Sequence, residues 1–164
     1  MKNSTSLKVV LLIALSCFMF NMKASAQSAT SSNKAQLAAN QILKRTSVCI
    51  YEGQKWEIVG KIYTDNLAKA IQHQQYACKL YAAGDYANAI IQSHRARLIV
   101  MDVIRANKGN VNPLYQFTEN ENKWLQNAPD DQTLDAASQK NSTMVSMKDS
   151  DYATGGIADI VPGE

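Results

Sequence analysis

Two helical patterns separated by a very short turn, within residues 64–107, constrain the fold of this chain more than any other feature. The first pattern follows a capping residue, Thr64 or Asp65, and its apolar positions are Leu67, Ile71, Cys78 and Tyr81. Gly84 suits the left-handed turn that ends a helix, and Asp85 suits the cap of the next one. Two long helices joined by so short a turn must lie antiparallel, so the sequence predicts a helical hairpin.

The second helix of this hairpin carries one long apolar stripe. Its members are Tyr86, Ala89, Ile90, Ser93, Val100 and Ile104, and the sequence Asn-Lys-Gly-Asn at 107–110 ends the helix. Small residues at Ala77, Ala89 and Ala96 allow two helices to pack closely, and Tyr86 closes the end of the groove between them. The two helices are therefore expected to pack tightly along their length.

The turn and the small positions of the hairpin follow a known repeat pattern over residues 70–103. The matching residues are Gly84, Asp85 and Tyr86 in the turn and Ala77, Ala89 and Ala96 at the small positions. In these positions the hairpin resembles a tetratricopeptide repeat, a unit of about 34 residues, although His73 stands where that family often has Trp. The chain has no convincing second copy. The resemblance implies a helical hairpin of a kind that mostly binds peptides or proteins.

The segment before the hairpin is helical at its start and ambiguous at its end. A helix is expected from near Ser32, with Ala35, Ala38, Ile42 and Cys49 close to one face. Residues 46–63 alternate in a way that fits either a β-hairpin or a helix interrupted at Gly53 and Gly60. We favour the interrupted helix, because both neighbours are helical and an isolated two-stranded hairpin is marginally stable.

After the hairpin, apolar residues become sparse. Leu114, Tyr115, Phe117, Trp124 and Leu125 are expected to dock on the hairpin through a short helix. Pro129 and Asp130 can start a further helix with a weak inner face of Leu134, Ala137 and Met144. The predicted fold is all-α: a small antiparallel helical bundle over residues 34–140, built on the repeat-like hairpin, with a flexible polar tail over 141–164.

The N-terminus has the features of a secretory signal peptide over residues 1–26. Lys2 and Lys8 precede an apolar run, and Ala24-Ser25-Ala26 forms a small-x-small cleavage site. The run is shorter than the ~20 residues that span a bilayer, so no transmembrane anchor is expected after cleavage. The sequence predicts export to the periplasm or the extracellular space, with a flexible lead-in over 27–33. The alternative is a lipoprotein processed at Cys17.

Cysteine and charge patterns leave two questions open. In an oxidising compartment Cys49 and Cys78 could form a disulfide, and the alternative is two buried thiols. Residues 27–108 hold eleven Lys and Arg against five Asp and Glu, whereas residues 109–164 hold three against nine. The acidic end could fold back on the basic part, or the basic part could meet an acidic partner. Two solvated faces of opposite sign are the simpler interpretation.

No catalytic motif stands out in the chain, and the sequence nominates no catalytic residue, metal site or cofactor. His73 and His94 lie at similar heights in the hairpin, on its flanks. Two solvent-facing imidazoles are the expected arrangement. In the alternative, these histidines and Arg97 form a small-ligand or metal site or an active site, although zinc would need further ligands.

The favoured hypothesis is a non-enzymatic interaction or scaffold module of the cell envelope. The candidate binding residues are exposed cations on the hairpin, namely Lys69, Lys79, Arg95, Arg97 and Arg105. Their charge suits an acidic segment of a partner protein. Nucleic acid is not an expected partner, because no aromatic stacking platforms interleave with these cations.

Overall fold

The computed structural model describes the backbone of residues 4–142, 148–153 and 155–163, and the side chains in these ranges from residue 32 onward. The chain divides into two compact units, Met1–Ala35 and Gln36–Glu164. The hydrophobic core lies in the second unit. Met144, expected on the inner face of a helix, lies outside the described residues.

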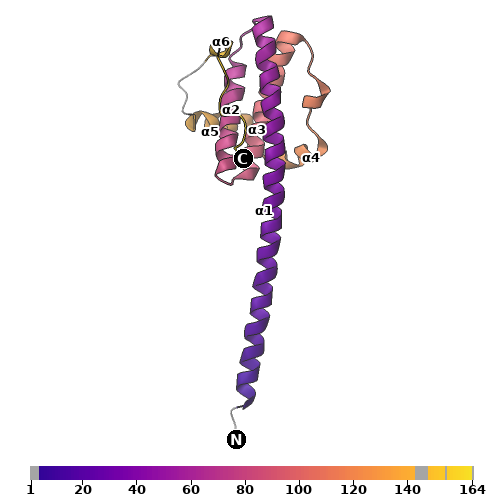
Figure 1. Cartoon of the computed structure of the whole chain (residues 1–164), viewed down its shortest axis with the longest axis vertical. Coiled ribbons are helices and arrows are strands. Elements are labelled where there is room, and N and C mark those ends of the chain that lie inside the picture. Colours follow the sequence, from indigo (N-terminus) through magenta and orange to yellow (C-terminus); the bar gives the residue numbers. More distant parts are fainter. Residues whose placement is uncertain (1–3, 143–147, 154, 164) are drawn as a thin grey trace. The chain divides into compact units, whose positions relative to one another are not determined.

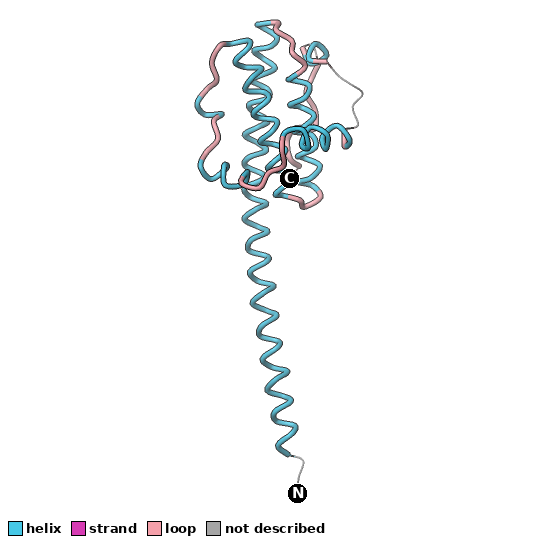
Figure 2. Tube along the Cα trace, turned by 180° about the vertical axis from the view of Figure 1, so that it is seen from behind, coloured by secondary structure: helices cyan, strands magenta, loops and turns pink. Residues whose placement is uncertain are grey.

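Helices and loops make up all of the described chain, and no strand occurs in it (Figure 2). The helices are α1 (Ser4–Gly60), α2 (Asn66–Ala82), α3 (Tyr86–Lys108), α4 (Glu119–Asn122), α5 (Asp131–Lys140) and α6 (Asp149–Tyr152), with 3₁₀ turns η1 (Pro113–Tyr115) and η2 (Lys123–Leu125) (Figure 1). Helices α1, α2 and α3 pack together around the main core. The all-α prediction is confirmed.

The α2–α3 hairpin has the turn that its sequence predicts. Gly84 adopts a φ of 81°, the left-handed conformation that glycine reaches without strain. Asp85 then caps α3, because its side chain accepts a hydrogen bond from the backbone N–H of Asn88 at 3.3 Å. Ala77, Ala89 and other small residues at the interface are fully buried. Membership of the tetratricopeptide family stays a prediction.

Helix α1 differs from its predicted form at both ends. It begins at Ser4, so residues 27–33, expected to be a flexible lead-in, are helical. It also continues through Gly53 to Gly60, so the predicted break at Gly53 is wrong and so is the β-hairpin alternative. Gly53 is buried against α3, where a Cβ atom would collide with the side chain of Val100. This glycine permits a close helix–helix approach rather than a break.

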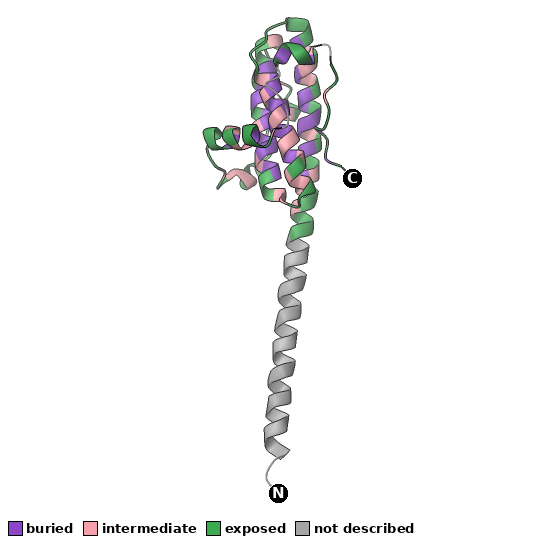
Figure 3. Ribbon diagram, turned by 90° about the vertical axis from the view of Figure 1, so that its left-hand side faces the viewer, coloured by how far each residue is buried: buried purple, intermediate pink, exposed green. Residues whose placement is uncertain are grey.

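The segment after α3 covers the flanks of the hairpin. Tyr115 and Phe117 pack on the main core, and Trp124 packs on a second cluster around Ile42 and Ile90. The predicted docking of these aromatic residues is therefore confirmed, whereas Leu114 is 72% exposed. Buried positions run along the packed helices of the bundle (Figure 3).

The flexible tail predicted over 141–164 is wrong for its described residues. Tyr152 and Ile160 are 3% and 1% exposed and belong to the main core. The backbone of the tail is also held: Gln54 Nε2 donates to the carbonyl of Tyr152 at 2.7 Å, and Gln74 Nε2 donates to that of Ile160 at 2.9 Å. Amide side chains of the helices thus bind backbone carbonyls of the tail, which compensates for its polar composition.

Candidate functional site

Arg97, predicted to be an exposed binding residue, is completely buried. Its Nη1 donates to Glu121 Oε1 at 2.9 Å, its Nε to Thr46 Oγ1 at 3.0 Å and its Nη2 to the carbonyl of Ile42 at 3.2 Å. The guanidinium also lies 5.1 Å from the centre of the Phe117 ring. With its donors engaged inside the bundle, Arg97 is a structural residue and not part of a free basic face.

Glu121 is the carboxylate that binds Arg97, and it also binds Arg45 of α1. Arg45 Nη1 donates to Glu121 Oε2 at 3.0 Å, and the same guanidinium bonds the carbonyls of Leu114 and Gln116. Burial alone would raise the pKa of Glu121, but the backbone hydrogen bond at Thr118 and the charge of Arg97 lower it. The two arginines thus fasten the α4 segment to α1 and α3.

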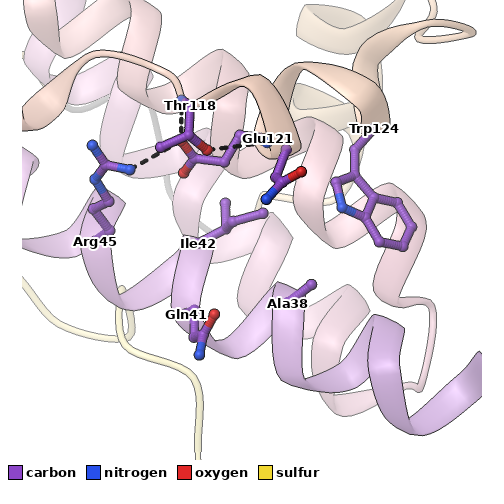
Figure 4. Close-up of a pocket in the computed structure, with 8 residues that line it drawn as sticks. Ala38, Gln41, Ile42, Arg45, Thr118, Glu121 and Trp124 are labelled. Carbon is purple, nitrogen blue, oxygen red and sulfur yellow. Dashed lines mark hydrogen bonds and ion pairs between the residues drawn. The ribbon is translucent and has the colours of Figure 1, made fainter.

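An open cavity of about 320 Å³ lies beside this ion pair. Figure 4 shows Arg45, Thr118 and Glu121 joined by hydrogen bonds at one end and Trp124 at the other. The remaining lining residues are Ala38, Gln41, Ile42 and Asn120. Because the Glu121 carboxylate is already bound by both Arg45 and Arg97, the cavity offers neither a nucleophile nor a free acid or base.

His73 is buried as well, so the expectation of a solvent-facing imidazole is wrong. Helix α5 covers this side chain, because the Nε2 atom of His73 lies 3.1 Å from Asp135 Oδ1. The Nδ1 atom of His73 lies 2.7 Å from Oε1 of Gln92, which belongs to α3. Burial lowers its pKa, although Gln92 and Asp135 act in the opposite direction. The helical periodicity of the hairpin predicts a ring at the surface, because that periodicity contains no information about α5, which covers the ring.

Ser138, His73 and Asp135 come together, but not as a catalytic triad. Ser138 Oγ lies 3.4 Å from the same Nε2 that Asp135 approaches, and it donates to the backbone carbonyl of Asp135 at 2.9 Å. A catalytic histidine uses one ring nitrogen for the acid and the other for the nucleophile. This group therefore anchors α5 to the hairpin and has no geometry for nucleophilic attack.

Asp135 also forms ion pairs with two further cations that were predicted to bind a partner. It lies 2.6 Å from Lys69 Nζ and 3.0 Å from Arg95 Nε, and Arg95 Nη1 lies 2.7 Å from Asp131. Despite the opposing effect of burial, hydrogen bonds from Arg95 and Lys69 hold the pKa of Asp135 at about 2.

The acidic end therefore folds back on the basic part, and the interpretation as two separate solvated faces is wrong. Of the remaining candidate cations, Lys79 is exposed and donates to the carbonyl of Asn141 at 2.9 Å. Arg105 is also exposed and pairs with Asp102 of its own helix. The five candidate residues do not form one free surface.

His94, the second histidine, is 1% exposed, which again contradicts the expected solvent-facing ring. Among the described residues neither ring nitrogen has a hydrogen-bond partner, and the ring packs against Phe117 with 4.5 Å between centroids. Burial, with a contribution from the charge of Arg97, lowers its pKa to about 4. His73 and His94 contact different partners, and the alternative site that would use both is not assembled.

Cys49 and Cys78 are free thiols, so the disulfide considered from the sequence is not formed. Cys49 belongs to the main core, and Cys78 packs on a separate cluster around Leu43 and Ala77. Burial raises the pKa of each thiol to about 12. Within the described residues, no group of three or more His, Cys, Asp or Glu side chains is placed to hold a metal ion.

One carboxylate pair was missed by the sequence reasoning. Asp65 stands at the N-cap of α2 with a φ of 60° and makes no cap hydrogen bond. Asp149 of α6 replaces it, accepting from the backbone N–H groups of Thr64 at 2.9 Å and Ala68 at 2.8 Å. Glu57 is 1% exposed beside it, and burial together with Asp149 raises the pKa of Glu57 to about 8. No local sequence signal identifies this pair.

The described part of α1 also has an exposed row of side chains, called the outer face here. Its members are Leu37, Lys44, Val48, Tyr51, Lys55 and Ile58. Val48 is 57% exposed and Ile58 is 43% exposed, although both are large and apolar. Sequence reasoning missed this face because it treated the alternation after residue 46 as ambiguous. The spacing by three and four residues was the available signal.

In the described residues, no helix combines the length and the apolar character needed to cross a membrane. No family model, curated protein sequence or solved structure matches this chain.

Proposed function

We propose that this chain is an exported, non-enzymatic module that binds another protein. The observation that carries the proposal is the outer face of α1, where large apolar side chains are exposed in one row. Within the row Val48 and Tyr51 are successive members, and Lys44 and Lys55 lie between the other apolar residues. Clustered exposed apolar side chains are typical of interaction sites, whereas single exposed apolar residues need no explanation. Of the exposed large hydrophobic residues, Leu37, Val48, Tyr51, Ile58 and Val59 all belong to α1.

The chemistry of the polar clusters also favours binding over catalysis. His94 is sealed against Phe117, and the hydroxyl of Ser138 donates to a backbone carbonyl. An acidic partner that used Lys69, Arg95 and Arg97 would have to displace carboxylates of the chain itself, namely Asp131, Asp135 and Glu121. The proposed binding surface is therefore the outer face of α1 and not the cations of the hairpin.

The binding proposal is tested by comparing variants in affinity capture from the cells that make the protein. Val48→Asp places a charge in the outer face and should abolish capture of the bound protein. Leu114→Asp is the matched control, since Leu114 is exposed but lies outside α1. If both variants capture the same proteins as the wild type, the outer face is not the binding surface and the proposal fails.

Export is tested separately by intact-mass measurement of the protein isolated from cells. Cleavage after Ala26 gives a chain that begins at Gln27. A lipidated Cys17 at the N-terminus would replace secretion with lipoprotein processing, and an uncleaved chain would contradict both routes.

A further inference from the structure

We infer that the outer face of α1 is a docking site for an amphipathic helix whose flanks carry acidic residues. The inference rests on the proposed function, and it adds the class of partner. It is drawn from three observations: the spacing of the outer face, the burial on the opposite side of α1, and the signs of the charges that border it.

The spacing is that of a helix–helix seam. Steps of seven, four, three, four and three residues lead from Leu37 through Lys44, Val48, Tyr51 and Lys55 to Ile58. At about 100° per residue these positions fall within an arc of about 80°, so they form one stripe along α1. Alternating steps of three and four are the a and d positions of a heptad repeat, which is the pattern that a second helix packs against.

The opposite side of α1 is already occupied. Leu43, Cys49 and Ile50 are fully buried in the bundle, and Thr46 accepts from Arg97 there. A surface helix of a globular protein needs one apolar stripe, facing the core. The second stripe has no partner within the described residues, and at about 1.5 Å per residue it extends about 30 Å from Leu37 to Ile58. That length accommodates three heptads of a partner helix.

The charge along the outer face is positive. Lys44 and Lys55 are exposed in the stripe itself. The acidic residues of α1 are withdrawn from it, since Glu57 is buried and Glu52 accepts from Trp56 Nε1 at 2.6 Å and lies 3.7 Å from Lys108 Nζ.

This charge pattern selects among the possible occupants. A second copy of the chain would bring together two stripes that each carry Lys44 and Lys55, and the repulsion between two positive faces costs free energy. A partner helix with Asp or Glu beside its apolar stripe complements both the apolar positions and the two lysines.

The first experiment uses the full chain and two synthetic 21-residue helices. Both peptides carry Leu at a and d positions, and the flanking e and g positions carry Glu in one and Lys in the other. The wild type should bind the acidic peptide and discriminate against the basic one. Val48→Ser with Ile58→Ser should weaken binding about tenfold or more. Lys44→Glu with Lys55→Glu should reverse the preference for charge.

The matched control removes two exposed apolar residues outside α1. Leu114→Ser with Val161→Ser should bind the acidic peptide as the wild type does, since both residues are exposed elsewhere in the fold. Circular dichroism melts establish that each variant is folded. Equal binding by the outer-face variant and this control overturns the inference, as does equal affinity for the two peptides. Self-association without peptide, or binding to anionic phospholipid vesicles in place of the acidic peptide, also overturns it.

Photo-crosslinking separates this inference from the proposed function. A photoreactive amino acid at Tyr51 is activated in the cells that make the protein, and mass spectrometry reads the crosslinked peptide. A crosslinked peptide with apolar residues at heptad spacing and acidic flanking residues supports both the binding function and the acidic-helix inference. A segment of different character overturns the acidic-helix inference and leaves the binding function standing. No protein adduct at Tyr51 overturns both.

Discussion

Replacing Glu57 by Gln tests whether the buried carboxylate pair controls the pH dependence of stability. Glu57 lies with Asp149 at the N-terminus of α2, where Asp149 accepts from Thr64 N–H and Ala68 N–H. A protonated Glu57 can donate to Asp149, while an ionised Glu57 repels it inside the bundle. The amide of the E57Q variant can also donate to Asp149, but it cannot ionise.

The sign and size of the effect follow from the pKa. Burial and Asp149 raise the pKa of Glu57 from 4.5 to about 8, so the folded protein keeps a proton that the unfolded chain releases. The stability contributed by this proton is complete below pH 4.5, decreases as the pH rises, and is lost above about pH 8. The slope approaches about 1.4 kcal/mol per pH unit midway between the two pKa values and is shallower near each of them, so the loss between about pH 5 and pH 8 is about 3.5 kcal/mol.

Urea unfolding of the wild type and E57Q at several pH values measures this difference. The variant should match the wild type near pH 5 and become more stable than it as the pH approaches 8. Burial lowers the pKa values of His73 and His94, so the free energy of unfolding decreases as the pH falls below 6.5. This decrease is the same in the wild type and in E57Q, and it cancels in their difference.

The matched control is E52Q, which removes a carboxylate from the same helix at a position closer to the surface. Its stability difference from the wild type should not grow over this pH range. A constant difference between E57Q and the wild type from pH 5 to pH 8 would refute the buried shared proton.

Three further outcomes follow from the buried groups. Arg97→Ala should lower the free energy of unfolding by about 3 kcal/mol, since it removes the fully buried one of the two arginines that bind Glu121, and the double variant R97M/E121Q should lose less in the same urea assay. His94→Leu should make stability less sensitive to acid between pH 6.5 and about pH 4, because the ring that must stay neutral is gone. Alkylation of the denatured, unreduced protein should label both Cys49 and Cys78, and a mass increase at neither would show that they are bridged.

The hairpin could be predicted from the sequence because its determinants are local. Gly84 and Asp85 lie next to the helix ends that they terminate and cap, and the small residues Ala77 and Ala89 lie on faces that helical counting locates correctly. Each of these signals needs only its neighbours within a few residues to be interpreted.

The burial of the polar candidates could not be predicted because its determinants are distant in sequence. His73 is covered by Asp135, which is 62 residues away, and the N-terminus of α2 is capped by Asp149, which is 81 residues from Ala68. A periodicity count on the hairpin treats every residue off the shared stripe as solvent-facing. The α4 and α5 segments add a layer that this count does not contain.

The conformation at Gly53 also depends on a contact that is distant in sequence. A glycine inside a helical pattern costs about 1 kcal/mol relative to alanine, so the sequence alone favours a break. The packing of Val100 against Gly53 gives the cost a structural reason, because a side chain there would force α1 and α3 apart. A helix-destabilising residue is kept where the tertiary contact needs its small size.

The charge asymmetry of the sequence therefore has a role inside the fold. The acidic C-terminal third supplies Glu121 and Asp135, which neutralise cations of α1, α2 and α3 and hold α4 and α5 in place. Lys44 and Lys55 lie among exposed apolar residues, away from those carboxylates. A partner that used the hairpin cations would have to displace the α4 and α5 segments. A partner that binds the outer face of α1 would contact charged and apolar side chains that are already exposed.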